Sequence, residues 1–211
     1  FAVRSHELAA AATDAGAFES QIIPVETENG TVSVDEGIRR GGSVEKLAKL
    51  QTVFKEDGVI HAGNASQISD GSAAMLVMSS QRAKELGLTP LVRVHTAVLA
   101  GADPIMMLTA PIPATEKALK KSGLSINDIG TFEINEAFAP VPLAWLKETG
   151  ANPDLLNPHG GAIALGHPLG GSGARLMSTM IHNMVNNNIK YGLQSMCEGG
   201  GQANATILEL L

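Results

Sequence analysis

The stretch TFEINEAFAPVPLAWLKETG, residues 131–150, decides the fold class of this 211-residue chain. TFEI is typical of a short strand, NEA of a polar elbow, and the apolar run that follows of a helix. The same order recurs on both sides, with a strand predicted at 91–100 and a helix between Pro113 and Gly123. Strands that alternate with helices favour a layered α/β domain with a largely buried sheet.

The remaining elements are predicted from periodicity and from end signals. Pro24 restricts a short strand at 21–27 to a sheet edge, and Ser43 is expected to cap a helix. The apolar run AAMLVM, residues 73–78, predicts a buried strand. The other predicted elements are helices at 1–17, at 80–88 and after the glycine-rich loop at 159–173, and strands before and after the loop at 197–204.

Bulk properties narrow the class of protein. The chain is 44% hydrophobic and 17% charged, as in folded globular domains, and its net charge of −6 argues against a nucleic-acid partner. No stretch reaches the roughly 18 continuous apolar residues that a membrane-spanning helix requires. A single cysteine excludes an internal disulfide, which favours a reducing, cytoplasmic location. The start FAVRSHELAAAA has neither an initiator Met nor a signal-peptide pattern, so we expect part of the protein to lie upstream.

Three polar residues follow apolar stretches at junctions between elements, where α/β folds place reactive groups. They are Asn135, His167 and Cys197, separated by 32 and 30 residues. Each also has a structural interpretation: Asn135 as a helix cap, His167 as a structural or exposed residue, and Cys197 as a small buried hydrophobic residue. The absence of HxxxH and CxxC patterns predicts no metal site.

The residues beside Asn135, His167 and Cys197 favour a catalytic role over a structural one. Glycines at 199–201 supply free backbone N–H groups beside the Cys197 thiol, and such donors can hold an oxyanion. An adjacent imidazole can exchange a proton with the thiol. The Asn135 amide can bind a water or a carbonyl oxygen, and Glu136 is expected to orient that amide.

Five motifs together resemble the thiolases, the acyl-CoA acetyltransferases. They are NEAFA at 135–139, GHPLGGSGAR at 166–175, CEGGG at 197–201, GNASQISDGSAAM at 63–75 and APIPA at 110–114. The resemblance runs from Phe1 to Leu211 and implies the C-terminal part of a layered α/β/α/β/α fold. It implies three segments: the end of a loop domain at 1–57, a returning segment of the N-terminal domain at 58–89 and the C-terminal domain at 90–211, with the seam at Thr89–Pro90.

The resemblance also implies reversible Claisen condensation and thiolysis of 3-oxoacyl-CoA. Cys197 then moves the proton at the α-carbon, and His167 activates a nucleophilic cysteine. His167, with a water held by Asn135, binds the thioester oxygen, while the Gly199 N–H contributes to a second oxyanion hole. The expected contacts of coenzyme A and substrate are Ser66, Ala62 and Ala65 along the pantetheine, Arg39 near the nucleotide, and Met107 and Phe138 at the acyl pocket. Coenzyme A and acyl-CoA are substrates, and no further cofactor is expected.

The lone cysteine leaves the implied reaction incomplete, because thiolases place the nucleophilic cysteine upstream. We therefore expect the chain to be inactive alone and to work with that N-terminal part, as a second chain or a nicked segment, in a homodimer or homotetramer. The alternative is a non-catalytic acyl-CoA-binding or scaffold protein of the same fold. Lys46 occupies a position where relatives often carry a serine that contacts coenzyme A, and it is a candidate partner for a phosphate.

Overall fold

The computed structural model describes all 211 residues, and its centre is one four-stranded sheet. Strands β4 and β5 are parallel, whereas β5–β6 and β6–β3 are antiparallel. The strand order is β3-β6-β5-β4. The strands are β3 (Val92–Gly101), β4 (Thr131–Ile134), β5 (Tyr191–Glu198) and β6 (Gln202–Leu210).

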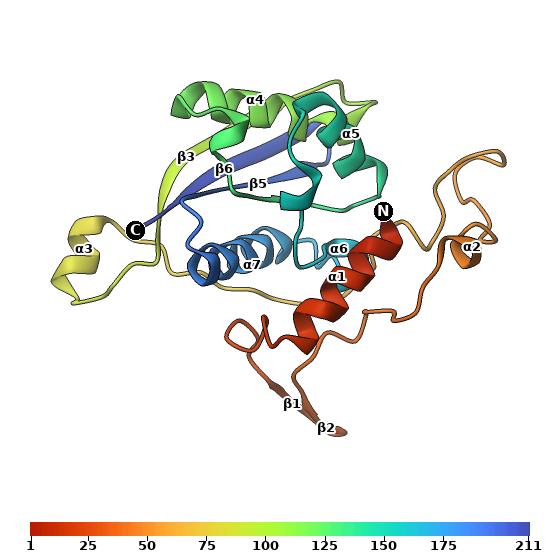
Figure 1. Ribbon diagram of the computed structural model, residues 1–211, viewed down its shortest axis with the longest axis horizontal. Helices are drawn as coiled ribbons and strands as arrows, with labels where there is room; N and C mark the ends of the chain where they lie inside the picture. Colours follow the sequence, from red (N-terminus) through yellow and green to blue (C-terminus); the bar gives the residue numbers. More distant parts are fainter.

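Helices cover both faces of this sheet, as the alternating pattern predicts (Figure 1). The helices α4 (Pro111–Ser122) and α5 (Pro140–Thr149) lie on one face, and α7 (Ser172–Asn187) lies on the other. The short α6 (Ala162–Leu165) contacts the N-terminal helix α1 (Ala2–Asp14). The expected layered α/β architecture is confirmed for this part of the fold.

The core follows from the side-chain alternation of the strands. Phe132 of β4 packs edge-on against Trp145 of α5 with ring centroids 5.1 Å apart. The Trp145 indole N–H donates to Thr115 Oγ1 at 2.8 Å, which satisfies the one polar atom of a fully buried ring. The opposite side of the sheet packs on α7, where the Asn183 amide donates to Thr131 Oγ1.

The helix ends match their sequence signals. Gly123 and Gly150 adopt the left-handed conformation after α4 and α5, and both helices begin with a proline. The hydroxyls of Ser43 and Ser79 cap α2 (Val44–Leu47) and α3 (Ser80–Glu85). Three 3-10 turns complete the helical elements: η1 (Met107–Thr109), η2 (Ile126–Asp128) and η3 (Pro153–Leu155).

The N-terminal third is less compact than the rest. β1 (Val25–Thr27) and β2 (Gly30–Val32) form an exposed hairpin that projects from the body (Figure 1). The strand predicted at 73–78 is wrong: the segment pairs with no strand, and Leu76 and Val77 are 81% and 72% exposed. An apolar run becomes a strand only when a neighbouring strand accepts its backbone groups, and this chain supplies none here. No helix is long and apolar enough to span a membrane.

Candidate active site

The carboxyl ends of β4 and β5 bring Asn135 and Cys197 to the same edge of the sheet. These two strands are parallel, with Ile134 opposite Ser195, and the Asn135 N–H donates to Ser195 O at 3.1 Å. Asn135 therefore follows β4 beside the last residues of β5, which include Cys197. The carboxyl edge of parallel strands is where α/β folds position reactive side chains.

His167 completes this group from the loop between α6 and α7. Its backbone N–H donates to both Gln67 O at 2.9 Å and Ser69 Oγ at 3.0 Å, which fixes the loop to the segment at 67–69. The imidazole Nε2 lies 3.3 Å from Asn135 Nδ2, and Nδ1 lies 2.6 Å from Ser172 Oγ. Two sequence-predicted residues that are 32 positions apart are thus in direct contact.

Both titratable groups of the site are held in their neutral forms. Burial lowers the pKa of His167 below its usual value, and the positive charge of Arg175 lowers it further. Burial also raises the pKa of the Cys197 thiol, and the charge of Glu198 adds to that effect. A neutral imidazole can accept a proton and a neutral thiol can give one, so the pair of states suits proton transfer.

Cys197 lies within a strand and not in the predicted loop. It pairs with Ala203 in the β5–β6 hairpin, whose turn is made by the three glycines. Gly201 has a φ of 80°, and a Cβ there would lie 2.8 Å from Ala102 O, so only glycine suits this position. The Gly199 N–H takes part in no hydrogen bond, and space around Gly199 is open. A backbone donor is therefore free beside the thiol.

Neither the helix-cap interpretation of Asn135 nor the expected role of Glu136 is correct. The helix α5 begins five residues later, at Pro140, with Ala139 at its N-cap, and the Asn135 Oδ1 atom is buried without a partner. The Glu136 carboxylate does not bond the Asn135 amide. It accepts hydrogen bonds from Ser5 Oγ at 2.6 Å, Asn157 Nδ2 at 2.9 Å and the Ile163 N–H at 3.2 Å. This carboxylate ties α1, the η3–α6 connection and α6 to the elbow after β4.

Several residues expected to contact coenzyme A lie along the elbow. The Ser66 N–H donates to Ala137 O at 2.9 Å, and Ala65 forms a β-bridge with Phe138. Ala62, just upstream, is exposed. Phe54, which the sequence analysis did not select, packs edge-on against Phe138 with centroids 5.8 Å apart. Its only sequence signal is an aromatic side chain in a polar loop.

Arg39 and Met107 approach from other segments. Arg39 is exposed, and its backbone N–H donates to His6 Nδ1. Met107 begins η1, directly after a loop that packs on Gly201, and the Ala102 N–H donates to Gly201 O at 2.7 Å. Met107 therefore follows a loop that contacts the glycine turn of the Cys197 hairpin. Lys46 is exposed and donates to Gly41 O.

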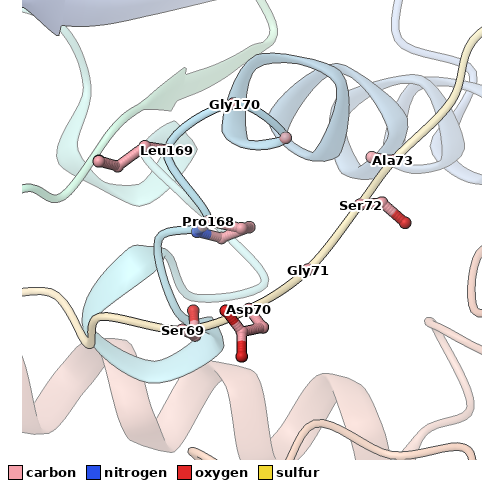
Figure 2. Close-up of a pocket in the computed structure, with 9 residues that line it drawn as sticks. Ser69, Asp70, Gly71, Ser72, Ala73, Pro168, Leu169 and Gly170 are labelled. Carbon is pink, nitrogen blue, oxygen red and sulfur yellow. The ribbon is translucent and has the colours of Figure 1, made fainter.

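An open cavity of about 350 Å³ adjoins the histidine loop. Figure 2 shows the turn at 168–170 facing the extended segment at 69–73 across this space. Ser69 lies on the wall of the cavity and also accepts the His167 N–H. One wall of the cavity is therefore formed by the same backbone segment that anchors His167.

The structure also contains a cluster of three buried polar side chains, Glu133, Gln194 and Arg175, which the sequence analysis did not predict. Glu133 and Gln194 lie opposite one another on β4 and β5, and their side chains are buried without hydrogen-bond partners. The guanidinium nitrogens of Arg175 are buried and unpartnered as well. Burial raises the pKa of Glu133 to about 8, while the nearby Arg175 opposes that shift.

The fold is thus a layered α/β fold whose sheet edge carries an imidazole in contact with an amide, a neighbouring thiol on β5 and a free backbone donor. Two family models match the chain: "Thiolase, N-terminal domain" over residues 1–81 and "Thiolase, C-terminal domain" over residues 88–210. The chain belongs to the thiolase family, as its motifs indicate.

Curated relatives agree with this assignment. The steroid 3-ketoacyl-CoA thiolase FadA6 of Mycobacterium tuberculosis is 56% identical over 100% of this chain and 51% of its own length. A 3-ketoacyl-CoA thiolase of Photobacterium profundum is 49% identical over 99% of the chain and 56% of its own length. The chain thus spans about half the length of the curated relatives it matches.

Solved structures share the fold. An acetyl-CoA acetyltransferase of Bacillus anthracis superposes with a TM-score of 0.95 at 42% identity, over 100% of this chain and 54% of that one. The human mitochondrial 3-ketoacyl-CoA thiolase in complex with CoA superposes with a TM-score of 0.93 at 39% identity, over 100% and 53%. The thiolase-like fold class is therefore confirmed.

Proposed function

We propose that this chain supplies the proton-transfer and oxyanion-binding half of an acyl-CoA acetyltransferase. The reaction is the reversible Claisen condensation and thiolysis of a 3-oxoacyl-CoA with coenzyme A. The names of the relatives run from a steroid 3-ketoacyl-CoA thiolase to an acetyl-CoA acetyltransferase, and each contains a thioester of coenzyme A. A 3-oxoacyl-CoA, which the two 3-ketoacyl-CoA thiolases name, is the substrate class proposed for this chain.

The observation that carries the proposal is the contact between His167 Nε2 and the Asn135 amide at 3.3 Å. It lies at the sheet edge where the Cys197 hairpin presents an unused Gly199 N–H. An amide and an imidazole in contact can share a thioester oxygen, directly or through a water held by Asn135. A purely structural site has no need for this combination of unused donors and neutral groups.

In the condensation direction, the upstream cysteine gives its proton to His167 Nε2 as it attacks a first acyl-CoA, and the coenzyme A thiolate that leaves takes the proton of the Cys197 thiol. The resulting Cys197 thiolate takes the α-proton of an acetyl-CoA, and the negative charge moves to the thioester oxygen. The protonated Nε2 of His167 and the Asn135-bound water donate hydrogen bonds to that oxygen. The α-carbon then attacks the carbonyl of an acyl group carried on the upstream cysteine, whose thiolate leaves as the new carbon–carbon bond closes. The Gly199 N–H stabilises the oxyanion formed in that step, and His167 returns its Nε2 proton to the leaving thiolate of the upstream cysteine.

Coenzyme A is proposed to run along the segment that pairs with the elbow. Ser66, Ala62 and Ala65 border the pantetheine, Arg39 lies toward the nucleotide, and Met107 and Phe138 border the acyl group. The β-bridge between Ala65 and Phe138 supports this arrangement, because Ala65 is proposed to line the pantetheine and Phe138 the acyl group that continues from it. Coenzyme A and acyl-CoA act as substrates, without a further cofactor.

The proposed partner is the N-terminal part of a thiolase, as a second chain or a nicked segment, within a homodimer or homotetramer. Two observations support it: the chain matches about half the length of its relatives, and the apolar segment at 73–78 is extended and unpaired. An unpaired extended segment offers its backbone N–H and C=O groups to a strand from another chain. The single free cysteine favours a cytoplasmic site of action.

Complementation tests the proposed function. The chain is mixed with a separately produced upstream half, and thiolysis of acetoacetyl-CoA is followed by the consumption of the 3-oxo thioester. We expect turnover only with both parts present, and its loss in Cys197→Ala and His167→Gln. The exposed Glu116→Gln on α4 is the matched control. Coenzyme A binding without turnover in the assembled protein would favour the alternative, a non-catalytic acyl-CoA-binding protein.

A further inference from the structure

The hydroxyl of Ser172 occupies a specific place behind the imidazole of His167. Ser172 is the first residue of α7 and is 1% exposed. Its Oγ lies 2.6 Å from His167 Nδ1 and 2.8 Å from Pro168 O. The histidine ring is thus held on one side by Ser172 and on the other by Asn135 at 3.3 Å.

The protons of these contacts can be assigned. A serine hydroxyl carries one proton, and the Pro168 carbonyl can only accept, so the hydroxyl proton belongs to that bond. Ser172 Oγ is then an acceptor toward His167, and Nδ1 must carry a proton. On the other side, Asn135 Nδ2 can only donate, which requires an unprotonated Nε2 in the neutral ring. Both sides of the ring select the same tautomer.

The local backbone keeps Ser172 in this place. The N–H groups of Gly171 and Ser172 both donate to Pro168 O, at 2.9 and 2.8 Å, and so form the turn that leads into α7. His167 is itself anchored through its N–H to Gln67 O and Ser69 Oγ. Imidazole and hydroxyl therefore sit on two ends of one short, doubly anchored loop.

We propose that Ser172 is a positioning residue that holds His167 as the Nδ1–H tautomer, with the basic Nε2 directed at the Asn135 side of the site. This inference rests on the proposed function for its catalytic meaning. Without the Ser172 hydroxyl, Nδ1–H loses its buried acceptor, and the two neutral tautomers become closer in energy. Nε2 then spends less time as the free base.

The tautomer is measured directly by ring ¹⁵N chemical shifts in histidine-labelled protein, on the full chain alone and with the upstream half. His167 signals are assigned by their loss in His167→Gln. At pH 8 we expect a protonated Nδ1 and an unprotonated Nε2. In Ser172→Ala the two shifts should move toward each other, and Ser172→Thr, which keeps the hydroxyl, should restore them. Ser178→Ala, on the same helix, should leave them unchanged. An Nε2–H tautomer in the parent, or unchanged shifts in Ser172→Ala, would overturn the proposal.

Kinetics of the complemented enzyme separate this proposal from the proposed function. We expect Ser172→Ala to lower the kcat of thiolysis roughly 10- to 100-fold with little change in KM, and Ser172→Thr to recover it. Nδ1–H in the parent without turnover in any assembly would refute the proposed function and support the role of Ser172. Turnover with an Nε2–H ring would refute the role of Ser172 alone. The parent spectrum decides the assignment even if Ser172→Ala does not fold.

Discussion

A Cβ atom on Gly161 would lie 2.2 Å from the carboxyl carbon of Glu136. The glycine is required because the chain before α6 passes directly over this buried carboxylate, which joins Ser5, Asn157 and Ile163 to the elbow of the site. The backbone at Gly161 is extended, so close approach and not an unusual φ makes glycine necessary. The packing of this glycine therefore controls where Glu136, and the adjacent Asn135, can lie.

We expect Gly161→Ala to lower the free energy of unfolding by about 1–3 kcal/mol, since a methyl group here forces the carboxylate out of its hydrogen bonds. Urea denaturation measures the effect. Gly42→Ala is the control, because nothing lies within 4 Å of its added Cβ. Equal stability of the two variants would show that the carboxylate moves without cost.

The pH dependence of stability should reveal Glu133. Its pKa is raised from 4.5 to about 8 by burial, so the folded chain keeps this proton while the unfolded chain loses it. The folded state thus binds more protons between about pH 4.5 and 8, and its stability falls as the pH rises through that window. Glu133→Gln removes this proton uptake. The free energy of unfolding of this variant should therefore fall less with rising pH than that of the parent, by up to a few kcal/mol over the window.

Urea titrations at several pH values test this expectation for Glu133. The exposed Glu116→Gln serves as the control, and its free energy of unfolding should change with pH as that of the parent does. The prediction fails if Glu133→Gln keeps that pH dependence as well.

Alkylation by iodoacetamide reports on Cys197 alone, because it is the only cysteine. Burial raises the pKa of its thiol, so little thiolate is present at neutral pH. We expect the folded chain to react more slowly at pH 7 than the urea-unfolded chain, and its rate to keep rising past the pH where the unfolded chain levels off. A folded chain that reaches its plateau at a lower pH would contradict the raised pKa.

Lys46 offers a separate test of coenzyme A binding in the assembled protein. Its exposed ammonium group donates one hydrogen bond to Gly41 O and has two further N–H donors for a phosphate. We expect Lys46→Ala to weaken coenzyme A binding severalfold, with a larger effect at low salt, as for other exposed charge pairs. Titration calorimetry measures this affinity. Lys120→Ala on α4 is the control, and equal affinities of the two variants would exclude a role for Lys46.

The sequence by itself determined the alternation of strands and helices and the signals for the helix ends, and it predicted Asn135, His167 and Cys197 as candidate site residues. These signals are local: Ser43 and Ser79 cap helices through groups three residues away, and Gly123 and Gly150 end helices through their own backbone freedom. Burial imposes periods of about 2 and 3.6 residues on strands and helices, so element types can be inferred without tertiary contacts.

Only the tertiary structure decided how the polar groups are paired. Glu136 bonds Ser5 across 131 positions, and Asn135 meets His167 across 32. The segment at 73–78 carries a strand pattern but is unpaired, and Cys197 lies inside β5 and not in a loop. A buried polar atom or an extended backbone is satisfied by whatever the fold brings beside it, and no local pattern specifies that neighbour.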